Sequence, residues 1–157
     1  MSTDSVFNGK LTRAYTEADN PDPLNHYAKT KYLGECPVLE SSCGIVLRTN
    51  ILGWGSGKKT TFFEWLLNGL QSEAKLTLFD DVFFSPITVD QCASVIEKLI
   101  SADTPGLFHC GSSNSISKYE FGLLTAEIFN FPHTNIAGVG VDSFGFDARR
   151  PKNMSLD

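Results

Sequence analysis

The sequence predicts an α/β fold with a mainly parallel sheet, and three observations lead to this prediction. Short apolar runs rich in β-branched residues alternate with stretches whose apolar residues recur at helical spacing. Turn residues and repeated helix-start signals separate the two kinds of segment. The composition, 41% hydrophobic and 20% charged over 157 residues, is enough to bury a core. Strict alternation of strand and helix is typical of a parallel sheet, which carries its functional side chains at the carboxyl ends of its strands.

Length, charge and cysteine spacing exclude several classes of protein. The length predicts a single domain over residues 1–157. A net charge of −5 argues against binding to a phosphate backbone, so we expect no nucleic-acid partner. No apolar run approaches the ~20 residues that cross a membrane, and the start of the chain lacks signal-peptide features, which indicates a cytoplasmic protein. The four cysteines lack zinc-ligand spacing, so we expect no metal site and mostly buried free thiols.

The first elements follow an irregular stretch over residues 8–25, where Asn20-Pro21-Asp22-Pro23 supplies turn chemistry. A helix is expected over about 24–39. The next segment, 44–49, is a short β-branched run bounded by Gly44 and predicts a strand.

Three later helices are each predicted by a capping box of the form S/T-x-x-E/Q, in which two side chains satisfy free amides at the helix start. The pairs are Thr61 with Glu64, Thr88 with Gln91, and Ser117 with Glu120. Apolar stripes of helical period follow the second and third boxes, and the runs 75–79 and 106–110 between the helices predict strands.

The first candidate for chemistry is a Y-x-x-x-K pattern, Tyr27 with Lys31, on the first predicted helix. Residues four apart lie on one helical face, so the phenol and the ammonium are neighbours. A nearby ammonium stabilises phenolate, which suits Tyr27 to donate a proton to a carbonyl oxygen. An exposed helix face without catalytic chemistry fits the same pair, so the interpretation depends on its surroundings.

Motifs around this pair run in one order along the whole chain. They are S-T-D-S-V-F-N-G (2–9), Y-T-E (15–17), P-x-P-L-N (21–25), G-E (34–35), L-R-T (47–49), P-x-x-x-D (86–90), G-L-F-H (106–109), S-K-Y-E-F (117–121) and R-P-K-N-x-S-L-D (150–157). The set resembles the extended short-chain dehydrogenase/reductase family and, within it, the dTDP-4-dehydrorhamnose reductase group.

The resemblance implies a role for each matching residue. Thr3 would polarise the substrate carbonyl, Asp4 would assist at the same oxygen, and Tyr27 would act as the general acid. Lys31 would hold the nicotinamide ribose of NADP or NAD and support Tyr27. The implied reaction reduces a nucleotide-activated 4-keto sugar, with hydride from the cofactor and a proton from the protein.

Residues 50–55 depart from the S-W-V-Y-G of the reductase group and are similar to the N-x-x-G of other extended members. We therefore assign Asn50 to substrate and cofactor binding. Trp54 is assigned to substrate stacking, with loop packing as the alternative. Arg150 is assigned to the substrate diphosphate, because guanidinium binds phosphate through two parallel hydrogen bonds.

No G-x-x-G-x-x-G fingerprint occurs, although this motif opens the dinucleotide-binding half of such folds. The expected structure is therefore a partial Rossmann-like parallel sheet with a small C-terminal substrate-binding region, and with the N-terminal dinucleotide-binding half missing. On this interpretation the chain is the central and C-terminal portion of a longer protein, or a truncated reading frame.

Two other functions stay open beside the reductase. One is a non-catalytic, NADP-binding regulatory subunit of the type found with methionine adenosyltransferase. The other is a sugar-nucleotide epimerase or dehydratase, because dehydratases usually carry an acidic residue where Asp4 stands. The partner hypotheses are a nucleotide-sugar substrate and a second copy of the chain, as a homodimer.

Overall fold

The computed structural model describes residues 1–157 and has the α/β architecture that the sequence predicts. Its helices are α1 (His26–Leu39), α2 (Phe62–Gln71), α3 (Val89–Ser101) and α4 (Lys118–Ile128), with the 3-10 turns η1 (Asp4–Val6) and η2 (Val141–Ser143). Its strands are β1 (Ile45–Thr49), β2 (Ile51–Leu52), β3 (Leu76–Phe79), β4 (Phe83–Phe84), β5 (Ile87–Thr88), β6 (Gly106–Cys110), β7 (Ile116–Ser117) and β8 (Ile136–Val139). No helix is long and apolar enough to span a membrane.

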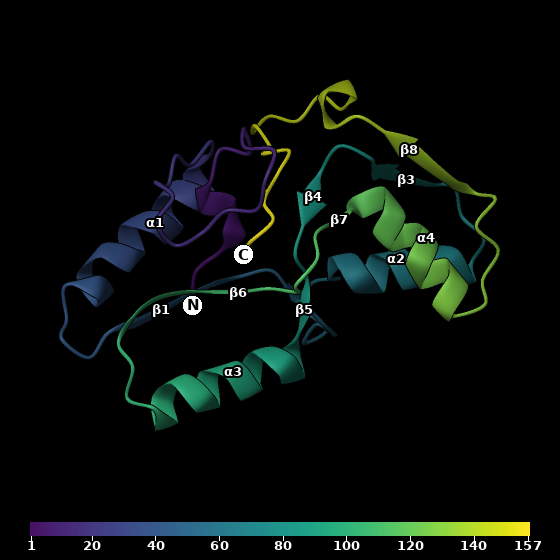
Figure 1. Ribbon diagram of the computed structural model, residues 1–157. Coiled ribbons are helices and arrows are strands. Elements are labelled where there is room, and N and C mark those ends of the chain that lie inside the picture. Colours follow the sequence, from purple (N-terminus) through teal and green to yellow (C-terminus); the bar gives the residue numbers. More distant parts are fainter.

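The elements form two lobes (Figure 1). In the first lobe β1 and β6 pair in parallel, with α1 on one side of the pair and α3 on the other. The apolar stripe of α3, with Cys92 at its buried centre, packs against the strands around Leu47, Ile87 and Cys110. This burial explains why the 89–100 stripe predicted the helix well, because one apolar face must lie against the sheet.

In the second lobe α2 and α4 pack against the parallel pair of β3 and β8 (Figure 1). The core of this lobe is made of Leu66, Leu70, Leu76, Leu78, Ala126 and Ile136. Strand β8 was not predicted, because its sequence Ile-Ala-Gly-Val shows no strand alternation. Its strand conformation comes from pairing with β3, which lies 60 residues earlier in the chain. In this pair Leu76 stands opposite Ile136.

The strands pair two by two instead of forming one continuous sheet. Three of the four pairs are parallel, and β4 with β7 is antiparallel. The chain leaves β1 at Asn50, and Ile87 of β5 donates its amide to the Asn50 carbonyl. The two-residue strands β2 and β5 thus continue the strand pairing from the first lobe toward the second. Strands this short show no detectable periodicity in the sequence.

All three predicted capping boxes are present. Thr61, Thr88 and Ser117 each accept a hydrogen bond from the amide three residues on, and the Glu or Gln side chain at that position accepts one from the backbone amide of the capping residue. The first helix begins at His26, two residues later than expected, because Asn25 caps it and accepts from the Ala28 amide at 2.9 Å. All four cysteines are free thiols, but Cys36 and Cys43 are exposed, so only half of them are buried as expected.

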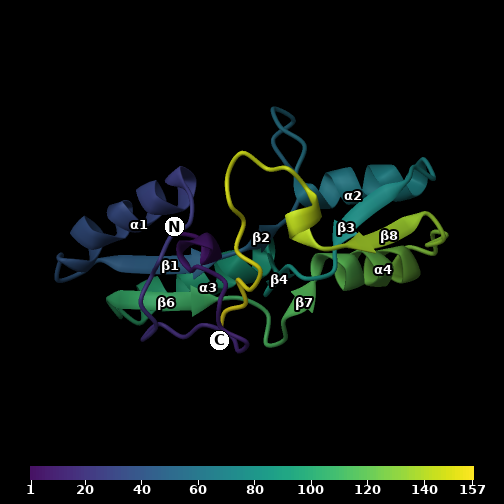
Figure 2. The same cartoon turned by 90° about the horizontal axis from the view of Figure 1, so that it is seen from above.

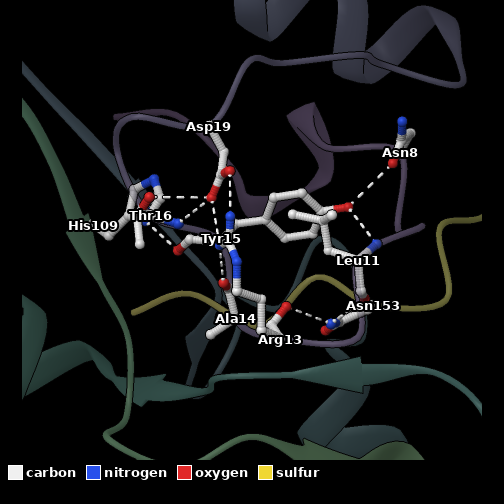
Figure 3. Close-up of polar contacts among 9 residues, drawn as sticks. All are labelled: Asn8, Leu11, Arg13, Ala14, Tyr15, Thr16, Asp19, His109 and Asn153. Carbon is white, nitrogen blue, oxygen red and sulfur yellow. Dashed lines mark hydrogen bonds and ion pairs between the residues drawn. The ribbon is translucent and has the colours of Figure 1, made fainter.

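The irregular N-terminal loop is ordered by polar contacts with the C-terminal residues (Figure 3). Tyr15 bridges to Leu156, and its hydroxyl donates to Asn8. The Asn153 amide donates to the carbonyls of Leu11 and Arg13 at 2.8 and 2.9 Å. These contacts bring the two ends of the chain together.

A C-terminal strap, residues 140–153, returns from the second lobe to the first and crosses between them in Figure 2. Lys152 anchors it through an ion pair with Asp81 at 3.0 Å, and a second ion pair, with Asp142 at 2.6 Å, joins two parts of the strap itself. The Asn25 side chain also donates to the Arg149 carbonyl, which joins the strap to the start of α1.

Candidate functional site

The candidate site consists of two neighbouring cavities that share Ser5, Tyr27 and Asn50. The first, here called the Thr3 cavity, measures about 360 Å³. Its lining consists of Met1, Ser2, Thr3, Asp4, Ser5, Tyr27, Thr49, Asn50 and Ile51. The second, here called the Lys118 cavity, measures about 320 Å³ and is lined by Ser5, Asn25, Tyr27, Asn50, Phe79, Val82, Lys118, Val141, Phe146, Arg150, Pro151 and Met154.

Thr3 and Asp4 stand where an extended N-terminal segment enters η1. Thr3 caps this turn by accepting from the Ser5 amide, and its hydroxyl donates to Asp4 at 3.0 Å. Asp4 is buried and accepts from the Asn50 side-chain amide at 2.6 Å. Burial raises the pKa of Asp4, while the hydrogen bonds from Asn50 and Thr3 oppose that rise. The structure therefore joins three sequence-predicted residues, Thr3, Asp4 and Asn50, in one hydrogen-bonded group.

Tyr27 and Lys31 lie in the first two turns of α1, four residues apart, so both are on the helix that the sequence predicts for the Y-x-x-x-K pattern. Tyr27 is 58% exposed and lines both cavities, so its side chain is open to solvent and to both spaces. The Lys31 ammonium donates to the Met1 carbonyl at 2.8 Å. Helix α1 is thus attached through Lys31 to the segment that leads into Thr3.

Lys118 is a site residue that the sequence analysis did not single out. It is the first residue of α4, and its ammonium lies 3.2 Å from the ring centre of Phe84 and 4.3 Å from that of Phe62. Burial lowers the pKa of Lys118 to about 8, against an opposing effect of the Asp4 charge. A cation is also disfavoured at a helix N-terminus, so two aromatic faces and Asp4 are what stabilise it. The only sequence signal was its place in the S-K-Y-E-F motif.

Arg150 enters the Lys118 cavity from the strap, where its guanidinium stacks on Phe146 with a separation of 5.2 Å. Lys118 and Arg150 are two cations on the wall of one cavity that also exposes Tyr27 and Asn50. This arrangement suits a ligand with an anionic part beside a polar, hydroxyl-bearing part.

Trp54 lies away from these residues. It is 71% exposed and lines a separate apolar groove of about 590 Å³ with residues of α3 and α4. Its indole contacts the Phe63 ring edge-on at 5.7 Å. The structure therefore brings Thr3, Asp4, Tyr27, Asn50 and Arg150 to the paired cavities, with Lys31 behind them, and places Trp54 on a separate groove.

The Thr3 cavity fits the nicotinamide end of a dinucleotide. Thr49 lines it and carries a buried hydroxyl that has no hydrogen-bond partner in the structure. A buried, unpaired hydroxyl is costly unless a ligand satisfies it. The remaining lining, with Thr3, Tyr27 and Asn50, offers further donors and acceptors for a carboxamide and a ribose.

The fold is of the short-chain dehydrogenase/reductase class: the parallel strand β1 ends at Thr49, in a cavity that Thr3 and Tyr27 also line. The chain matches the family model described as RmlD substrate binding domain over residues 1–157, and it belongs to that family.

Similar proteins include a subunit of methionine adenosyltransferase and a protein of polysaccharide biosynthesis. Methionine adenosyltransferase 2 subunit beta of Rattus norvegicus is 35% identical over 176 residues, covering 100% of this chain and 49% of that protein. Spore coat polysaccharide biosynthesis protein SpsK of Bacillus subtilis (strain 168) is 33% identical over 153 residues, covering 96% and 52%.

Among solved structures, dTDP-4-dehydrorhamnose reductase (rfbD) from Bacillus anthracis str. Ames in complex with NADP superimposes with a TM-score of 0.89 at 29% identity. The match covers 99% of this chain and 55% of that one. The chain thus spans about half the length of the relatives that it matches.

Proposed function

We propose that the protein containing this chain together with a dinucleotide-binding half reduces a nucleotide-activated 4-keto sugar at the expense of NADPH or NADH. The observation that carries the proposal is the position of Tyr27, which lines two neighbouring cavities of different character. One contains Thr3, Asp4 and the unpaired Thr49 hydroxyl, and the other contains Lys118 and Arg150. The likeness to sugar-nucleotide reductases supports the same reaction.

Each residue has a distinct part in the proposed chemistry. Bound NADPH or NADH supplies the hydride. Thr3 turns its hydroxyl proton from Asp4 to the substrate carbonyl, and Tyr27 delivers the proton to that oxygen as it becomes an alcohol. Lys31 orients the cofactor ribose and supports Tyr27. Arg150 and Lys118 bind the phosphates on the far side of the sugar, while Asn50 contacts both ligands.

The test measures NADPH consumption by the complete gene product with a dTDP-4-keto sugar, followed by the absorbance of the reduced cofactor. We expect turnover in the wild type and a fall in kcat of about 10²–10⁴-fold in Tyr27→Phe, because the general acid is lost. Tyr32→Phe removes the same atom from the same helix at a position that lines neither cavity, and should match the wild type. An inactive wild type, or a Tyr27→Phe variant with full activity, would refute the reductase.

The second candidate is a regulatory subunit, favoured by the 35% identity to methionine adenosyltransferase 2 subunit beta. A regulatory protein should bind a methionine adenosyltransferase catalytic chain and change its activity, and Tyr27→Phe should leave that effect unchanged. Such a result, together with no consumption of NADPH, would replace the reductase by this function.

A sugar-nucleotide epimerase or dehydratase would restore its cofactor within each turnover. Net consumption of one reduced cofactor per sugar therefore separates the reductase from these enzymes. The homodimer remains a prediction, and light scattering of the complete gene product measures it directly.

A further inference from the structure

Helix α1 presents Tyr27, Lys31 and Glu35 at intervals of four residues, and hence on one face. The extended segment Met1–Thr3 runs along this face. Lys31 donates to the Met1 carbonyl at 2.8 Å, and the next residue, Ser2, donates from its hydroxyl to Glu35. The contacts therefore place the segment that carries Thr3 in a defined register on the helix that carries Tyr27.

Glu35 also binds Arg48 of β1 through two parallel hydrogen bonds. The Arg48 Nε lies 3.0 Å from Glu35 Oε1, and Nη2 lies 2.6 Å from Oε2. Both side chains are only 2% exposed. Ser2 is tied to the same strand, because its amide donates to the Leu47 carbonyl at 2.7 Å. Glu35 thus joins three elements: α1, β1 and the N-terminal segment.

Stability alone does not account for this pair. Removing two charges from water costs several kcal/mol, and apolar residues of similar size often serve a core equally well. Arg48 carries a further cost, because its Nη1 is buried without a hydrogen-bond partner. The pair does, however, fix direction and distance, since a bidentate contact allows only one relative orientation of its partners.

We propose that Glu35 and Arg48 are positioning residues that hold Tyr27 and Lys31 of α1 in register with Thr3. They touch neither ligand in the proposed reaction and act through the segment Met1–Thr3 and the helix face. The inference rests on the proposed function for its chemical consequence, while the register itself is a property of the fold. General acid catalysis depends on such placement, and a displacement of about 1 Å can lower the rate by about 10²-fold.

The test replaces both charges in Glu35→Met/Arg48→Met within the complete gene product. We expect kcat to fall by about 10²-fold while the melting temperature changes little. Arg48→Lys keeps the charge but loses the two-pronged contact, so its kcat should lie between those of the double variant and the wild type. A purely structural role would instead lower the melting temperature and the active fraction without changing kcat per folded molecule.

The matched control is Arg13→Met/Asp19→Met. This pair is also bidentate, with both contacts at 2.7 Å, and lines neither cavity (Figure 3). Its kcat should equal that of the wild type. If the Glu35→Met/Arg48→Met protein does not fold, the variants Arg48→Lys and Ser2→Ala decide the proposal instead. Each leaves Glu35 with a partner, and each should lower kcat if the positioning role holds.

Amide hydrogen exchange separates this proposal from the proposed function. In the Glu35→Met/Arg48→Met variant, or in Arg48→Lys, we expect faster exchange confined to residues 2–4 and to α1. An inactive wild type would refute the proposed reductase function. Amide hydrogen exchange would still show whether Glu35 and Arg48 hold the segment Met1–Thr3 in register with α1. Unchanged exchange in these segments, or unchanged kcat in a folded double variant, would overturn the positioning role.

Discussion

Lys118 illustrates at the residue scale how a site can oppose stability. Its ammonium is desolvated at the positive end of α4, and burial lowers its pKa to about 8 from an ordinary value of 10.5. A difference of that size corresponds to roughly 3 kcal/mol against the charged form. Lys118→Met should therefore raise the free energy of unfolding at pH 7, by about 1–3 kcal/mol once the lost aromatic contacts are deducted. Urea unfolding measures this, and a less stable variant would contradict it.

The same lysine predicts a pH dependence with a definite sign. Below about pH 8 Lys118 is charged in both states, and the destabilisation is complete. Between about pH 8 and 10.5 the unfolded chain binds a proton that the folded protein has released, so the stability of the wild type rises relative to Lys118→Met. The difference between the two proteins should shrink over this range. A difference that stays constant up to pH 10 would show that Lys118 is not desolvated.

At the scale of elements, the helix starts offer a direct comparison. Ser117 is buried, and its hydroxyl accepts from the Glu120 amide at 3.0 Å, whereas the Thr88 box is exposed. Ser117→Ala should cost about 1–2 kcal/mol of stability and Thr88→Ala about 0.5–1 kcal/mol, because water can replace only the exposed hydroxyl. Chemical denaturation of both variants measures the order, and equal costs would show that burial of the cap has no effect.

At the scale of the whole molecule, Gly9 joins the N-terminal loop to the strap. Its φ is +75°, and a Cβ there would lie 2.5 Å from the Lys152 amide nitrogen and 2.8 Å from Pro151 Cβ. Gly9→Ala should thus cost both backbone strain and the contact with the strap, about 1–3 kcal/mol or more in total. Arg150 directly precedes Pro151 and Lys152, so affinity for the proposed nucleotide-sugar substrate should fall as well. Thermal unfolding and equilibrium binding measure the two effects, and an unchanged melting temperature would contradict the close approach.

By itself the sequence determined the features that depend on neighbouring residues. The helices and their three capping boxes follow from local patterns, because their hydrogen bonds join residues close in sequence. Short apolar runs also marked the strands at 45–49, 76–79 and 106–110, although the partner of each strand lies far away in the sequence. The motifs around Thr3, Tyr27 and Lys31 also singled out the candidate catalytic residues, and their order along the chain indicated the family.

Only the tertiary structure decided which side chains share a space. Ser2 reaches Glu35 across 33 residues, Asn50 reaches Asp4 across 46, and Lys118 and Arg150 come to one cavity from α4 and the strap. It also decided the strand conformation of β8 and the separation of Trp54 from the site. These outcomes depend on burial and on contacts between distant segments, which set the energy of a side chain only after the two lobes have packed.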